Sequence, residues 1–71
     1  MKVRVLGDER TVIAFRLAGI GGEVISSRKS AANAIEKSKD VGIFLVMDDF
    51  FPSQYDKALP ILVRIPRRRR E

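Results

Sequence analysis

The chain has 71 residues, no cysteine, no histidine and a formal net charge of +5. Because a typical domain has roughly 100 to 150 residues, this length leaves room for one hydrophobic core and excludes a second domain. Without cysteine or histidine the chain lacks thiolate and imidazole zinc ligands and the Ser/His and Cys/His nucleophile pairs, so any chemistry would have to rest on carboxylates, lysine or tyrosine. We expect a domain that binds a partner rather than one that catalyses a reaction, and we assign no metal or cofactor site.

The positive charge is concentrated at the C-terminus. Without residues 67–71 the chain has 10 basic and 8 acidic residues, so the predicted domain, residues 1–66, is nearly neutral, and residues 67–71 form a basic tail. A nucleic acid would attract Arg67–Arg70, but a terminal charge run without interleaved aromatics is more typical of a solvated tail. No apolar run approaches about 18 residues and no signal peptide is evident, which predicts a cytoplasmic chain that reaches a membrane only through another protein.

The first half of the chain predicts two βα units. Residues 3–6 form a short β-rich run, and residues 9–18 contain no helix breaker. The glycines that follow end this first helix, and residues 23–25 make a weak strand. Ser26 or Ser27 is placed to cap a second helix that runs to about residue 39.

The second half predicts a buried central strand and an edge strand. Residues 42–47 are apolar without alternation, as in a parallel strand buried on both faces. Residues 48–59 number about a dozen, the minimum length for a crossover between parallel strands, and Pro52 is placed to open one or two helical turns there. Residues 60–65 supply the edge strand. The predicted fold class is α/β: a four-stranded parallel sheet of order 2-1-3-4, a truncated three-layer arrangement of flavodoxin-like or Rossmann-like type.

One face of this sheet is expected to be short of cover. Right-handed crossovers put the first helix on one face and the second and third on the other. One helix cannot cover four strands, and the chain reaches Glu71 before a further helix returns. We therefore expect part of the sheet to be shielded by a partner or to lie open, with self-association through this face or an edge strand when partners are missing.

The first helix is apolar nearly all round. Within residues 11–18, Val12 and Phe15 lie on one side and Ile13 and Leu17 on another, whereas a surface helix needs one stripe about 100° wide. Two apolar sides indicate either two contacts or a small core that uses every available methyl group. The candidate partner-binding residues of this helix are Phe15, Arg16 and Leu17.

Three aromatic residues, Phe50, Phe51 and Tyr55, lie in or beside the short segment before the last strand. Aromatic residues are enriched at the centres of protein interfaces, so all three are candidate partner-binding residues. The alternative is that they seal the base of the last crossover.

An acidic cluster follows the C-terminal ends of the first and third strands: Asp8, Glu9, Asp48 and Asp49. Open α/β sheets place ligands at this edge, and the cluster resembles the magnesium-binding pocket of response-regulator receiver domains. Receivers have five strands and a lysine after the fifth, which this chain lacks, and acidic residues also favour helix N-termini. A small receiver-like signalling domain and a nucleic-acid accessory protein that uses the arginine tail are thus the alternative functions.

One run of residues is more specific than the rest: Phe15-Arg16-Leu17-Ala18-Gly19, which follows the Gly7-Asp8 strand end. With residues 41–43 and 59–66, it resembles the F subunit of A-type and V-type rotary ATPases, as a short member lacking the usual C-terminal extension. The resemblance implies a non-catalytic central-stalk subunit that binds the coiled-coil shaft subunit and adjoins the catalytic head. Such a subunit would support proton or sodium transport coupled to ATP synthesis or hydrolysis, and would be peripheral to the membrane.

Overall fold

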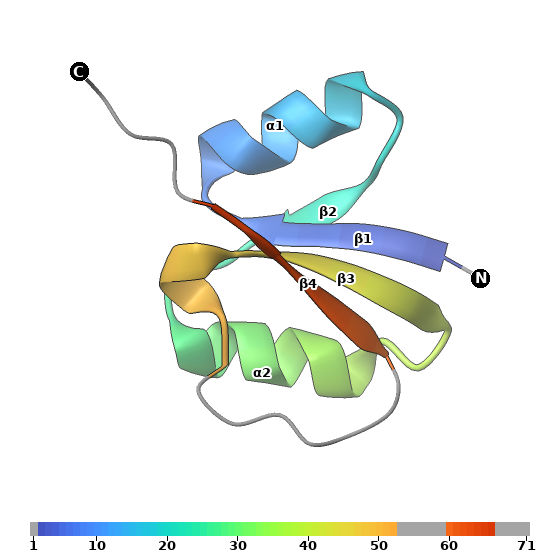
Figure 1. Cartoon of the computed structure of the whole chain (residues 1–71), viewed down its shortest axis with the longest axis vertical. Helices are drawn as coiled ribbons and strands as arrows, with labels where there is room; N and C mark the ends of the chain where they lie inside the picture. Colours follow the sequence, from blue (N-terminus) through green and yellow to red (C-terminus); the bar gives the residue numbers. More distant parts are fainter. Residues whose placement is uncertain (1, 53–59, 67–71) are drawn as a thin grey trace.

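Four parallel strands form one sheet in the order β2-β1-β3-β4 (Figure 1). The structure is a computed structural model that describes residues 2–52 and 60–66. Its elements are β1 (Lys2–Gly7), α1 (Glu9–Leu17), β2 (Gly22–Val24), α2 (Arg28–Lys37), β3 (Val41–Met47), the 3-10 turn η1 (Asp48–Phe50) and β4 (Ile61–Ile65). The predicted α/β class, the parallel pairing and the strand order are all confirmed.

An aspartate cap precedes helix α1, and a glycine with positive φ follows it. The Asp8 carboxylate accepts a hydrogen bond from the Thr11 amide over 2.8 Å, which is an N-cap. After the helix, Gly19 has φ 93°, a left-handed conformation that favours glycine.

Strand β2 begins one residue earlier than the predicted strand 23–25, because Gly22 pairs with Val5 of β1. A Cβ atom at position 22 would lie 2.2 Å from Val5 Cγ1 and 2.3 Å from the Val5 carbonyl oxygen. Only glycine allows the two strands this approach, so a residue that reads as a breaker is part of the strand.

Helix α2 is capped by Ser27, whose hydroxyl oxygen accepts a hydrogen bond from the Ser30 amide over 3.1 Å. The helix ends at Lys37, two residues before the predicted end. The Ser38 amide donates the last bond to the Ala34 carbonyl. Of the two serines considered as caps from sequence, Ser27 is therefore the one used.

A short helical turn, η1, follows β3 and was not predicted from the sequence. Turn η1 precedes Pro52, and the Phe51 amide closes it by donating to the Asp48 carbonyl over 3.3 Å. Phe50 and Phe51, at the end of this turn, pack against the core. The predicted turns that open at Pro52 would fall on residues 53–59, so they stay a prediction. Residues 53–59 lie outside the described residues.

The main core lies between the sheet and α2. Helix α1 covers the opposite face, where Val12 is 1% exposed, and it packs against β1 and β2 (Figure 1). The arrangement agrees with the predicted split of the first two helices. The buried cluster on the α2 side is formed by Leu6, Ile25, Ala31, Ala34, Ile35, Val41, Phe44 and Val46.

The α1 side of β3 and β4 lacks the cover of a helix among the described elements. Residues paired in a parallel sheet point to the same face, and Met47 marks the α1 face because the Thr11 hydroxyl donates to its sulfur over 3.7 Å. Strand register then puts six aliphatic residues on this face, half-buried or exposed. We call them the open sheet face: Val3, Ile43, Leu45, Ile61, Val63 and Ile65. Among the described residues, the predicted shortage of cover is confirmed.

Candidate partner-binding surfaces

Helix α1 presents two different faces. Thr11, Val12 and Phe15 are buried or half-buried toward the sheet, whereas Ile13 and Leu17 are 45% and 85% exposed on the outer side. Of the predicted candidates, Leu17 and Arg16 are exposed, and Phe15 is half-buried. Ile13 was not among the candidate partner-binding residues predicted from the sequence, although its i, i+4 spacing from Leu17 places both on one helix face.

Hydrogen bonding separates the arginines of the described residues into two groups. The guanidinium of Arg4 donates to the Gly22 carbonyl over 3.2 Å, and Arg64 pairs with the Asp48 carboxylate. Arg28 donates to the Phe51 carbonyl over 3.2 Å. The other two, Arg10 and Arg16, are both on α1, both exposed, and make no side-chain hydrogen bond or ion pair with residues 2–52 or 60–66.

The aromatic candidates lie on the other face of the sheet. Phe50 and Phe51 are half-buried and pack against the main core. The guanidinium carbon of Arg64, on β4, lies 4.2 Å from the centre of the Phe51 ring, which is a cation–π contact. These contacts fit the structural alternative, the sealing of the crossover. The third aromatic candidate, Tyr55, lies outside the described residues.

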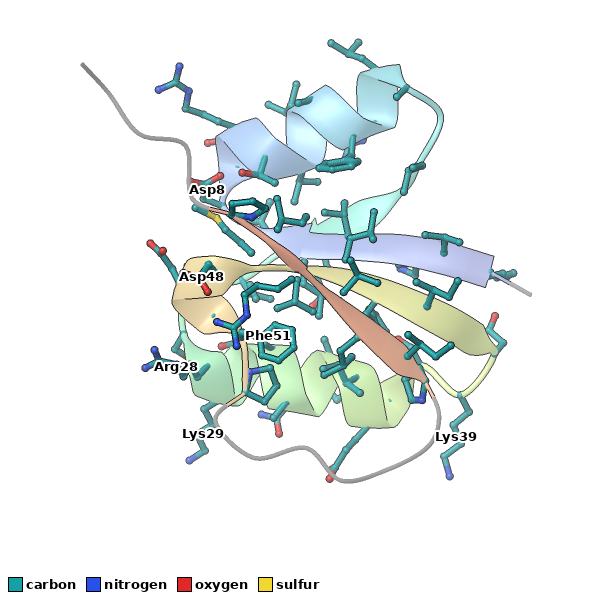
Figure 2. The ribbon with its side chains drawn as sticks, in the orientation of Figure 1. Asp8, Arg28, Lys29, Lys39, Asp48 and Phe51 are labelled. Atoms are coloured by element: carbon teal, nitrogen blue, oxygen red, sulfur yellow. The ribbon has the colours of Figure 1, made fainter. Side chains whose placement is uncertain are left out.

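Two of the four residues of the acidic cluster, Asp8 and Asp48, are held by structural contacts. Asp8 and Asp48 lie at the same edge of the sheet (Figure 2). Asp8 caps α1, and Asp48 pairs with Arg64, so both carboxylates have a role in the fold. Among the residues that the structure describes, no group of three or more His, Cys, Asp or Glu side chains is arranged to hold a metal ion. The helix cap and the ion pair are sufficient to explain why carboxylates occur at positions 8 and 48, without a bound metal ion. Residues Arg67–Arg70, on which the nucleic-acid alternative depends, lie outside the described residues.

An ion pair at the opposite edge of the sheet links the start of β1 to the segment before β3. Lys2 Nζ lies 3.0 Å from an Asp40 carboxylate oxygen, and both side chains are exposed. The hydrogen bond from Lys2 is the main cause that lowers the pKa of Asp40 below its ordinary value. Because the pair is exposed, it contributes little to stability.

These features define the class of protein: a small parallel α/β domain that exposes apolar side chains both on its sheet and on the outer side of α1. Residues 3–71 match the model of a protein family described as ATP synthase (F/14-kDa) subunit, and the chain belongs to this family. The match confirms the resemblance noted in the sequence.

Three relatives are each named as the F subunit of an A-type ATP synthase. The proteins of Thermococcus kodakarensis, Thermococcus onnurineus and Thermococcus sibiricus are 34%, 32% and 35% identical to this chain. Each match covers 93% of this chain and 74% of the relative. Within residues 2–52 and 60–66, no helix is long and apolar enough to span a membrane.

Proposed function

We propose that this chain is a non-catalytic subunit of the central stalk of an A-type or V-type ATPase. In this role it binds the coiled-coil shaft subunit and adjoins the catalytic head. It supports proton or sodium transport coupled to ATP synthesis or hydrolysis, and it is peripheral to the membrane through the complex.

The observation that carries this proposal is the family match over residues 3–71, with three relatives named as the F subunit of an A-type ATP synthase. The surface supports it. Leu17 is 85% exposed, and Val3, Ile61 and Val63 of the open sheet face are also exposed; clustered apolar side chains on a surface are a mark of protein–protein contact sites. A domain this small also buries a modest fraction of its surface alone and benefits from a partner.

A pull-down with tagged full-length chain in an extract of the native cytoplasm tests the proposal. The expected result is stoichiometric recovery of a coiled-coil shaft subunit with other ATPase components. The purified shaft subunit of the same organism then gives a direct titration. Failure of the two purified proteins to bind would refute the central-stalk assignment.

We propose that the isolated chain, without its partners, self-associates through the open sheet face. All six side chains of that face are aliphatic, so two copies can meet there without burying a charge. Light scattering over a hundredfold range of concentration measures this. A mass that stays at the monomer value throughout would contradict the proposal.

A further inference from the structure

The outer face of α1 carries a second amphipathic pattern that the fold does not use. Exposed residues occur at Arg10, Ile13, Ala14 and Leu17, which have the spacing i, i+3, i+4 and i+7 of one continuous helix face. The inward residues 8, 11, 12 and 15 repeat the same spacing and are all buried or half-buried. Helix α1 thus has two complete contact faces, and the sheet occupies only the inner one. We call residues 10, 13, 14 and 17 the outer stripe of α1.

No described element of the chain lies on the outer side of α1, which forms one border of the molecule (Figure 1). Leu17 is the most exposed large apolar residue on the described surface. Ala14, next to it on the stripe, is small enough to let another helix approach closely. Two helical turns of α1, about 10 Å along its axis, are therefore available for contact.

The charges around the stripe indicate the chemistry of the partner. Arg10 lies within the stripe and Arg16 lies one turn after Ile13, and neither guanidinium has a partner among the described residues. Arginine beside exposed aliphatic residues is typical of interface centres, because its planar guanidinium binds carboxylates in a bidentate way. Glu9, in the first turn, is the single acidic residue of the helix.

We propose that the outer stripe of α1 docks an α-helix whose apolar side chains meet Ile13, Ala14 and Leu17 and whose Asp or Glu side chains pair with Arg10 and Arg16. This inference rests on the proposed function, and it assigns the docking helix to the coiled-coil shaft subunit. The contact is helix on helix, over about two turns.

A second copy of this chain complements the stripe less well. An α1–α1 contact would bring two arginines and one glutamate from each copy, so a guanidinium of each copy would lack a carboxylate. A desolvated charge without a partner is costly. A helix with its own carboxylates satisfies both arginines.

Titration calorimetry of the full-length chain with the purified shaft subunit tests the assignment. Leu17→Asn, Arg10→Glu and Arg16→Glu are each expected to weaken binding by about tenfold or more, with a smaller effect of the two charge reversals at high salt. The matched control is Lys29→Glu, an exposed charge reversal on α2 (Figure 2 shows Lys29). Val63→Asn, on the open sheet face, is the comparison that asks whether the shaft subunit binds that face instead. Lys29→Glu is expected to stay within about twofold of the unaltered chain, and thermal melts check that every variant folds.

The possible results separate the two claims. No binding by the unaltered chain overturns the proposed function and this assignment together. Binding that is normal in the three α1 variants but lost in Val63→Asn overturns the assignment alone and moves the contact to the sheet. Because the chain has no cysteine, a Leu17→Cys variant carries a single site for a thiol cross-linker. Cross-linking to the shaft subunit supports the assignment, whereas exclusive cross-linking between copies of this chain overturns it.

Discussion

Truncation of one side chain on each face of α1 separates the face that stabilises the fold from the face that is free to bind. Val12→Ala removes two buried carbon atoms from a side chain that is 1% exposed. At about 0.8 kcal/mol per buried carbon, with a term for the cavity left behind, the cost is about 2 kcal/mol. In Leu17→Ala the side chain is already 85% exposed, so the cost is below about 0.5 kcal/mol.

Thermal unfolding followed by circular dichroism, at one fixed protein concentration, measures both variants. For a domain of this size about 1 kcal/mol corresponds to roughly 4–8 °C, so Val12→Ala should lower Tm by about 8–16 °C and Leu17→Ala by less than about 4 °C. The two residues belong to one helix of nine residues, so each variant is the control for the other. Equal losses of stability would refute the separation of α1 into a core face and a free face.

Three further predictions concern the fold itself. Asp8→Ala removes the N-cap of α1 and should cost about 1 kcal/mol, a fall in Tm of roughly 4–8 °C; an unchanged melt would mean that the cap contributes nothing. Gly22→Ala forces a Cβ atom against Val5 and should cost at least about 1–3 kcal/mol, measured by urea unfolding; a neutral result would disprove the close approach of the strands. Lys2→Gln should raise the pKa of Asp40 toward its ordinary value, measured by NMR of the carboxyl carbon, and no change would show that the ion pair is absent in solution. Because Lys2 depresses the folded-state pKa, the contribution of Asp40 to stability is present above its ordinary pKa and is lost as the pH falls through the folded value.

The candidate surfaces could be predicted only in part. The sequence placed Leu17 and Arg16 on an over-apolar helix, and both are exposed. It offered no means of seeing that Arg10 and Arg16 lack partners among the described residues while Arg64 is taken up by Asp48 and Phe51. Such pairing depends on residues far apart in the chain, so no local pattern contains it.

The contacts of the aromatic and acidic candidates were also not visible in the sequence. Aromatic composition suggested an interface at Phe50 and Phe51, and packing against the core accounts for both side chains. Proximity to strand ends suggested a ligand pocket at Asp8 and Asp48, and hydrogen bonding accounts for both carboxylates. Residue type alone does not distinguish a group that binds a ligand from one that stabilises its own fold.

Sequence patterns were sufficient to establish the fold class, the strand order and the shortage of cover on one face. The elements follow from local periodicity and from the apolar run at residues 42–47, the strand order from the flavodoxin-like arrangement, and the faces of the helices from the right-handedness of crossovers. Three-dimensional packing was needed to show that Gly22 belongs within a strand, that the helical turn precedes Pro52, and which arginines of the described residues have partners. The physical reason is that burial and pairing are properties of neighbours in space, and those neighbours are brought together only when the sheet packs against both helices.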